Sequence, residues 1–318
     1  MSTTIPTSTS IGFWLVKLRK IHFMQFLLLF MVLLVQVLQQ VSALGCGHVV
    51  NGTLTIPASM TSIGGSAFAG CSALKLITIP ASVTSIGSNA FHSCSALTSV
   101  SFAAGSLVTS IEQMVFYGTG LRSITLPASV TSIGSWAFYG CSALTSVSFA
   151  ASSQLTSIGT LAFGNSGLTS ITIPASVTSI SNVAFRDCGA LISVSFAASS
   201  MLTSIGDGAF SSTGLTSITI PASVTSIGAS AFESCSVLAT ISYACSNSQL
   251  TVGVNAFKGT PYAINGRAVP ETTCRVVNIP LDCYAVDSSG HVLQAFTRQR
   301  SAMLRALLVI VATQRPAA

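Results

Sequence analysis

The chain has 318 residues, of which half are hydrophobic and only 6% are charged, whereas an ordinary soluble domain carries about 25% charged residues. The formal net charge is +6. It lies in the two ends, because the four bases and four acids between residues 51 and 260 cancel. Proteins that bind nucleic acids carry a basic surface on their folded part. The neutral middle of this chain therefore argues against a nucleic-acid partner.

Residues 1–43 have the pattern of an export signal. A basic cluster at 17–20 precedes the apolar run 23–35, and small residues at 41–43 offer a cleavage site for a signal peptidase. The apolar run is shorter than the roughly 20 residues of a membrane-spanning helix. Two fates of this leader remain open, which are cleavage and retention as a membrane anchor. Met24 is an alternative start of the chain.

The middle of the chain repeats itself. The stretch LTSITIPASVTSI at 168–180 returns unchanged at 215–227. Phenylalanine recurs at spacings that settle into an alternation of 22 and 25 residues, so that the full unit is a pair of turns 47 residues long. The recurring phenylalanines are Phe68, Phe91, Phe116, Phe138, Phe163, Phe185, Phe210, Phe232 and Phe257. Such a fixed period is the signature of a repeat architecture.

Each turn contains the same order of expected elements. In the turn that starts at Leu121, the segment LRSITL alternates apolar and polar residues and predicts a strand. Pro127 ends that strand, because proline cannot donate the next hydrogen bond. Residues 130–133 (VTSI) predict a second short extended piece, and residues 135–138 (SWAF) predict a short helical or 3₁₀ piece. Stacking of such turns buries the apolar edge that one turn leaves open.

The pattern LxxIxIPxSVTSIGxxAFxxCxxL resembles the BspA-like leucine-rich repeats, a family of surface proteins in bacteria and several protists. The resemblance covers residues 51–262. It implies a right-handed solenoid of about nine turns, with a parallel β-sheet on its concave side and short helical, 3₁₀ or extended convex segments. It also implies a role in surface adhesion or recognition, and it carries no shared catalytic residue. We therefore divide the chain into a leader (1–43), a solenoid (44–262) and a C-terminal cap with a basic tail (263–318).

Stacking turns each repeat position into a ladder with rungs about 4.8 Å apart. Two strand positions carry hydroxyl side chains in almost every turn, and we expect them to face outward. Arg122 lies at a third strand position that we also expect to be exposed. Lys75 occupies the same position two turns earlier, and together the two side chains can anchor a carboxylate or sulfate group. The candidate binding face is Thr78, Ser99, Ser101, Arg122, Ser123, Thr125, Ser146, Ser148, Ser170, Thr172, Ser193, Ser195, Ser217 and Thr219. Three interpretations stay open, namely a solvated sheet face, a hydrogen-bonding array for a partner, and an ice-binding surface.

The nine cysteines lack the CxxC spacing of zinc or redox sites. Cys71 and Cys94 lie in adjacent turns, within the distance that a disulfide spans. Cys274 and Cys283 follow the repeats and are candidates for a disulfide that holds a cap. The cysteines that recur every 47 residues are two turns apart, which is too far for a disulfide, and we expect buried thiols there.

Known catalytic and phosphate-binding motifs are missing from the sequence. We therefore expect no enzymatic activity, no cofactor and no metal. Asn51 begins the sequon Asn-Gly-Thr and is a candidate glycosylation site. The sequence predicts a secreted or cell-surface adhesion and recognition module whose partner is a protein or a glycan. The alternative is a structural or ice-interacting solenoid without a macromolecular ligand.

Overall fold

The computed structural model describes residues 44–243 and 250–261. The predictions for the leader, for the tail and for Cys274 and Cys283 lie outside the described residues. The chain divides into two compact units, residues 1–47 and residues 48–318. The repeats belong to the second unit, and a 3₁₀-helix, η1 (Cys46–His48), precedes them.

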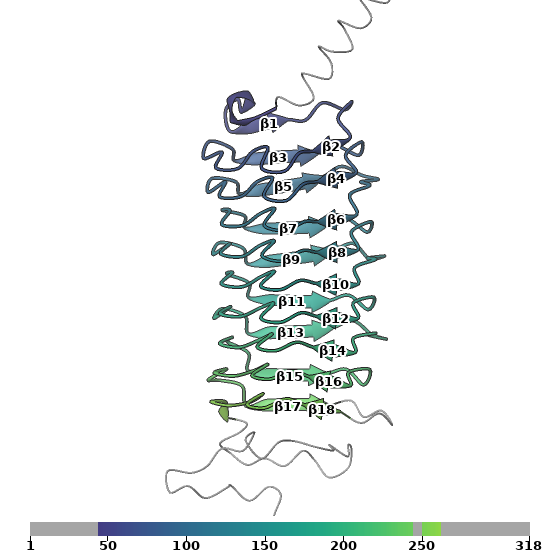
Figure 1. Cartoon of the computed structure of the whole chain (residues 1–318), viewed down its shortest axis with the longest axis vertical. Helices are drawn as coiled ribbons and strands as arrows, with labels where there is room; N and C mark the ends of the chain where they lie inside the picture. Colours follow the sequence, from purple (N-terminus) through teal and green to yellow (C-terminus); the bar gives the residue numbers. More distant parts are fainter. Residues whose placement is uncertain (1–43, 244–249, 262–318) are drawn as a thin grey trace, which may run out of the picture. The chain divides into compact units, whose positions relative to one another are not determined.

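The repeats form a coil in which each turn contributes one long and one short β-strand (Figure 1). The long strands are β1 (Thr53–Thr55), β3 (Leu76–Ile79), β5 (Ser99–Phe102), β7 (Ser123–Leu126), β9 (Ser146–Phe149), β11 (Ser170–Ile173), β13 (Ser193–Phe196), β15 (Ser217–Ile220) and β17 (Thr240–Tyr243). The short strands are β2 (Ser62–Ile63), β4 (Ser85–Ile86), β6 (Ser110–Ile111), β8 (Ser132–Ile133), β10 (Ser157–Ile158), β12 (Ser179–Ile180), β14 (Ser204–Ile205), β16 (Ser226–Ile227) and β18 (Thr251–Val252).

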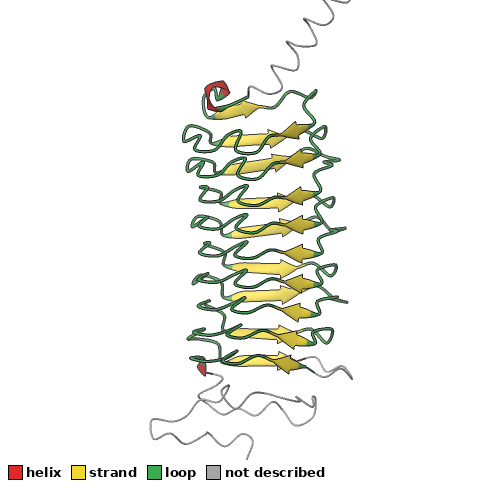
Figure 2. Ribbon diagram, viewed as in Figure 1, coloured by secondary structure: helices red, strands yellow, loops and turns green. Residues whose placement is uncertain are grey.

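All strand pairs between turns are parallel and join equivalent repeat positions. Long strands pair with long strands, as in Ser123↔Ser146, and short strands pair with short strands, as in Ser132↔Ser157. Figure 2 shows the two sets of strands stacked on two sides of the coil, with loops between them. The predicted repeat solenoid with a parallel sheet is confirmed.

The core of the coil is a set of apolar ladders. The nine recurring phenylalanines are all buried, and adjacent rings stack with centroids 5.1 to 5.6 Å apart. The strand residues alternate between surface and core, as the sequence predicts. Along β7, for example, the four residues are exposed, buried, exposed and buried in turn. Burial of a phenylalanine or an isoleucine in each turn is the main stabilising contribution, roughly 1.5–3 kcal/mol per side chain.

The predicted helical or 3₁₀ piece after the short strand is wrong. Residues 135–138 form turns instead, in which amides bond alternately within their own turn and to the next one. The Phe138 amide donates to the Ala162 carbonyl of the following turn (2.7 Å), whereas the Tyr139 amide donates to the Trp136 carbonyl (3.2 Å). A helix makes its backbone hydrogen bonds within one segment. Here part of these hydrogen bonds connect neighbouring turns instead.

Most turns contain two left-handed backbone positions, four residues apart, at this corner. The second position is taken by Gly, Ser, Asn or Asp, namely Gly70, Ser93, Gly118, Gly140, Asn165, Asp187, Ser212, Ser234 and Gly259. The first position holds Ser, Asn or Gly near both ends of the repeats. In four consecutive central turns it holds Met114, Trp136, Leu161 and Val183. A left-handed conformation costs such residues roughly 1–2 kcal/mol each.

Candidate functional site

The long strands present the predicted hydroxyl residues to solvent. All fourteen residues of the candidate binding face are exposed in the structure. They alternate with buried Ile, Val and Leu on the same strands, so the pleat separates core from surface. We call these exposed strand positions the hydroxyl face.

The hydroxyl face is divided into closely paired and loosely paired steps. Four residue pairs join β3 to β5, β7 to β9, β11 to β13 and β15 to β17. By contrast, only Ser99↔Ser123 joins β5 to β7 and only Ser146↔Ser170 joins β9 to β11. Strands β13 and β15 belong to separate sheets. The sheet is therefore closed at one step and open at the next.

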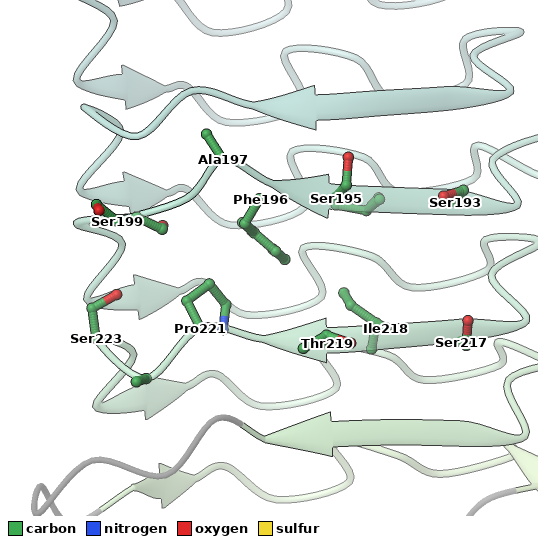
Figure 3. Close-up of a pocket in the computed structure, with 13 residues that line it drawn as sticks. Ser193, Ser195, Phe196, Ala197, Ser199, Ser217, Ile218, Thr219, Pro221 and Ser223 are labelled. Carbon is green, nitrogen blue, oxygen red and sulfur yellow. The ribbon is translucent and has the colours of Figure 1, made fainter.

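A groove lies at each open step. The first groove lies between β5 and β7 and has a volume of about 490 Å³. The second lies between β9 and β11 (about 730 Å³), and the third between β13 and β15 (about 480 Å³). Figure 3 shows the third groove, with Ser193 and Ser195 on one strand and Ser217 and Thr219 on the other. The three grooves recur with the 47-residue unit.

The open steps follow from the residues that end the strands. Each open step passes from a strand that ends in phenylalanine, such as Phe149, to a strand followed by proline, such as Pro174. Proline lacks the amide that would bond across the step. Proline alone is insufficient, because Pro80 follows β3 and yet β1 and β3 pair through Thr55↔Thr78. The half-buried phenylalanine at the end of the preceding strand is the distinguishing feature, since Ile56, the residue at this position in the β1–β3 step, is buried.

Each groove combines hydroxyl groups with a small apolar surface. The third groove is lined by Ser193, Ser195, Ser217 and Thr219, by Phe196 and Pro221 at the strand ends, and by small residues of the following corner. None of the residues that line the three grooves is charged. This lining can accept and donate hydrogen bonds and can pack against an apolar ring face.

Hydroxyl groups bond to each other across two of the closed steps. Thr78 Oγ1 lies 2.9 Å from Ser101 Oγ, and Thr172 Oγ1 lies 2.8 Å from Ser195 Oγ. A hydroxyl group has one donor and two acceptor sites. One such bond therefore leaves each of these side chains with hydrogen-bonding capacity for solvent or a ligand.

The serine at the end of each groove distinguishes the third groove from the others. Ser129 Oγ shares its one proton between the Ser106 and Val108 carbonyls (2.9 and 2.7 Å). Ser176 Oγ does the same with the Ser153 and Leu155 carbonyls of the preceding turn (3.1 and 2.6 Å). Ser223 Oγ, at the equivalent position of the third groove, is buried and has no hydrogen-bond partner. Buried polar atoms are usually satisfied, so this hydroxyl has unused capacity within the groove wall.

The charged residues do not converge on the hydroxyl face. Arg122 and Lys75 are both exposed, and their proposed role as an anion anchor stays a prediction. Asp187 pairs with Arg186 (3.4 Å) and Glu233 pairs with Lys258 (3.3 Å). Within residues 44–243 and 250–261, no group of three or more His, Cys, Asp or Glu residues is placed to hold a metal ion.

The predicted disulfide between Cys71 and Cys94 is wrong. Cys94 is a free, buried thiol, whereas Cys71 takes part in a disulfide bond, as does Cys46. The reason is the direction of the Cys94 side chain, because its Sγ donates to the Phe68 carbonyl of the preceding turn (3.0 Å) inside the core. Burial raises the pKa of the Cys94 thiol to about 11.

The other recurring cysteines are buried free thiols, as predicted. Sequence reasoning missed that hydroxyl residues occupy the same ladder in the intervening turns. Thr119 Oγ1 lies 3.3 Å from Cys141 Sγ, and both groups donate to the Phe116 carbonyl (3.0 Å each). The signal was available, since Thr119, Ser166, Thr213 and Thr260 follow the phenylalanine by a constant three residues.

Sequence reasoning also missed a threonine row beside the short strands. These exposed residues are Thr61, Thr84, Thr109, Thr131, Thr156, Thr178, Thr203 and Thr225. Most of their hydroxyl groups donate to the threonine carbonyl of the preceding turn, as Thr156 does to Thr131 (3.0 Å). We call these residues the threonine row. Their bonds tie neighbouring turns together.

A cluster of aromatic residues lies at the corner that follows the short strands. Tyr117 stacks on His92 and on Tyr139, with centroids 4.7 and 5.4 Å apart, and Trp136 contacts Tyr139 at 4.6 Å. All four side chains are half-buried. Asn51, the candidate glycosylation site, is exposed, and its modification stays a prediction. In the described part of the chain, no helix has the length and apolar character needed to cross a bilayer.

The chain resembles solved leucine-rich repeat structures. A leucine-rich repeat protein from Bacteroides ovatus is 30% identical, with a TM-score of 0.49; the match covers 65% of this chain and 62% of that one. The pneumococcal vaccine antigen PcpA is 21% identical over 67% of this chain and 71% of that one, with a TM-score of 0.50, and it supports the fold alone. A leucine-rich cell surface protein from Faecalibacterium prausnitzii is 26% identical over 60% of this chain and 69% of that one, with a TM-score of 0.38.

No curated protein matches the chain significantly. The family comparison is decisive, because the BspA type leucine rich repeat region matches in six copies over residues 50–152, 109–239 and 156–273. These matches cover well over half of the chain, and they coincide with the turns described above. The chain therefore belongs to the family of BspA type leucine-rich repeat proteins.

Proposed function

We propose that this protein is a secreted or surface-displayed recognition and adhesion module, and that the hydroxyl face is where it contacts a protein or glycan partner. The observation that carries the proposal is the repetition of one exposed hydroxyl pattern on strand after strand. Stacked repeats form extended surfaces that suit large partners. Charge is absent from the grooves, so recognition relies on hydrogen bonds and shape.

Two observations support an extracellular location. The leader has the order of an export signal, and the disulfide bonds of Cys46 and Cys71 are stable in oxidising compartments. We infer that the exported protein begins near Leu44, or that the leader anchors it in the membrane. Sequencing the amino terminus of the exported protein separates the two, because a start at Leu44 requires cleavage and a start at Met1 or Met24 requires an anchor.

We also propose that the protein is not an enzyme. The four acids of the repeats, Glu112, Asp187, Asp207 and Glu233, lie in different turns. The Asp207 carboxylate accepts a hydrogen bond from the Ala229 amide (2.7 Å), which gives it a role in linking turns. Acid–base catalysis needs titratable groups that converge in one pocket, and the grooves are lined by hydroxyl and apolar groups.

The proposal is tested by binding to panels of immobilised glycans and extracellular-matrix proteins. The variant Ser146→Lys/Thr172→Lys places charge and bulk on the hydroxyl face. The variant Thr156→Lys/Thr178→Lys does the same on the threonine row and is the matched control. We expect the first variant to lose binding by about tenfold or more and the control to keep it. Equal binding by both variants, or no binding of the unmodified protein to any panel, contradicts the proposal.

An ice-interacting surface is the alternative function. The threonine row is the surface to consider for it, because all of its residues are threonine, whereas the hydroxyl face mixes serine and threonine. Most of its hydroxyl groups already donate to backbone carbonyls, so we assign the row to holding turns together. An ice-recrystallisation assay distinguishes these roles. We expect no inhibition, and inhibition that disappears in Thr156→Lys/Thr178→Lys would instead identify an ice-binding face.

A further inference from the structure

We propose that the three grooves form one continuous site for an uncharged, linear, β-1,4-linked polysaccharide that lies across the strands, along the stacking direction. The inference rests on the proposed function and specifies its ligand. Three separate observations carry it, namely the chemistry of the lining, the unused hydrogen-bonding capacity of the walls, and the distance between grooves.

The lining of the grooves matches a neutral sugar. Its polar groups are hydroxyls, which both donate and accept hydrogen bonds and so complement the hydroxyl groups of a sugar ring. The half-buried Phe196 and Pro221 supply an apolar surface for the face of the ring in the third groove. No lining residue carries the positive charge that a sulfated or uronic-acid polymer would need. The chemistry therefore favours an uncharged glycan.

The walls of the grooves retain hydrogen-bonding capacity. Ser195 bonds to Thr172 on the closed side of its strand (2.8 Å), while its other side borders the third groove. Ser223 Oγ lines the same groove and is buried without a partner. Leaving such a group unsatisfied is unfavourable. Rotation of the Ser223 side chain toward the groove would let a ligand hydroxyl satisfy it.

The spacing of the grooves matches a polymer with a regular repeat. Successive grooves are two turns apart, which is about 10 Å for stacked strands. In an extended β-1,4-linked glycan, alternate sugars present the same edge, and one disaccharide has a similar length. An extended polypeptide repeats after two residues, about 6.6 Å, and does not match. A disaccharide per groove is therefore the simplest repeating ligand.

A polyproline helix is the peptide that comes nearest to this spacing, because three of its residues rise by about 9 Å. Proteins that bind such helices use grooves lined by exposed aromatic side chains. Each groove here has a single half-buried phenylalanine, Phe102, Phe149 or Phe196, and no tyrosine or tryptophan. The lining thus favours the glycan, and the peptide becomes an outcome of the test.

The test measures the affinity of the protein, expressed from the full sequence, for β-1,4-linked glucose and N-acetylglucosamine oligosaccharides of two, four and six sugars. We expect binding in one or both series to strengthen by about tenfold with each added disaccharide, since each reaches a further groove. A polyproline peptide of the same length and a heparin fragment are expected to bind at least about tenfold more weakly than the best hexasaccharide.

The variant Thr125→Val/Thr172→Val/Thr219→Val removes one hydroxyl from each groove and keeps the side-chain shape. We expect it to weaken hexasaccharide binding by about tenfold or more. The control Thr131→Val/Thr156→Val/Thr178→Val removes three hydroxyls from the exposed threonine row, outside the hydroxyl face, and we expect its affinity to stay within about twofold. Thermal unfolding of both variants verifies that they are folded.

The inference is overturned if no oligosaccharide binds, if affinity does not depend on length, if the two variants behave alike, or if the polyproline peptide binds more tightly. These results leave the broader proposal separately testable. Loss of panel binding by Ser146→Lys/Thr172→Lys, together with no oligosaccharide binding, would retain the hydroxyl face and reject the glycan. Equal panel binding by Ser146→Lys/Thr172→Lys and its threonine-row control, together with no oligosaccharide binding, would reject the hydroxyl face itself.

Discussion

At the scale of single residues, the left-handed corner position is the most informative feature. Gly and Asn adopt this conformation at low cost, whereas Val183 is β-branched and is a strong outlier with a φ of 53°. Four bulky residues in consecutive turns accept this cost. Their side chains are half-buried, so burial of apolar surface offsets part of the backbone strain.

Replacement of Val183 tests whether the strain is real. We expect Val183→Asn to raise the free energy of unfolding by about 0.5–1 kcal/mol, because asparagine tolerates the left-handed conformation. Val183→Ala is the control, since it trims the side chain without relieving the backbone, and we expect no gain from it. Urea unfolding measures both. A loss of stability in Val183→Asn would show that packing of the isopropyl group outweighs the strain.

The buried thiols predict a pH dependence of stability. Burial raises the pKa of Cys94 from 9.0 to about 11, so the unfolded chain releases this proton at lower pH than the folded one. The stabilisation is therefore complete below pH 9 and is lost as the pH rises toward 11. Cys94→Ser removes this contribution. Between pH 9 and 11 we expect its free energy of unfolding to fall less steeply than that of the unmodified protein, and parallel curves would contradict this expectation.

These residues also show what the sequence reveals. The phenylalanine ladder and the exposed hydroxyls are predictable, because period-two alternation and fixed spacing are local signals. The left-handed positions are not, since Trp136 and Leu161 are ordinary helix-compatible residues and only the bonds to the next turn impose the turn. The disulfide partner of Cys71 is not predictable either. The stacking of adjacent turns sets the distance between Cys71 and Cys94, but it does not determine the direction in which the Cys94 side chain points.

At the scale of strands and corners, the groove-end serines make a matched set. Ser176 Oγ donates its proton to two neighbouring carbonyls of the preceding turn, while Ser223 Oγ has no hydrogen-bond partner. We expect Ser176→Ala to cost about 1–2 kcal/mol and Ser223→Ala to cost nothing or to stabilise slightly. Chemical denaturation of the two variants measures the difference. Equal losses would show that Ser223 is bonded in solution.

The open and closed steps were not predicted from the sequence, although their origin lies in it. The 47-residue period distinguishes strands that end in Phe102, Phe149 and Phe196 from those followed by Pro127, Pro174 and Pro221. Whether this pair of residues opens a parallel sheet depends on packing between turns, which no single turn encodes. The comparison with Pro80, where the sheet stays closed, identifies the phenylalanine as the second requirement.

At the scale of the whole molecule, the repeats present several distinct surfaces. The hydroxyl face is polar and grooved; its grooves are uncharged, and Arg122 is a charged residue on the face. The threonine row and the aromatic corner contain side chains that bond or stack between turns. In the function proposed above, partner contact belongs to the hydroxyl face, and cohesion of the stack belongs to the other two surfaces.

Photo-crosslinking tests this assignment most directly, because it works even when the partner is unidentified. A photoreactive amino acid replaces Ser146 on the hydroxyl face, Thr156 in the threonine row or Tyr139 in the aromatic corner, and each protein is irradiated on the surface to which it adheres. We predict crosslinked partner from position 146 and little from positions 156 and 139. Crosslinks that form mainly from position 156 or 139, with none from 146, would contradict the assignment.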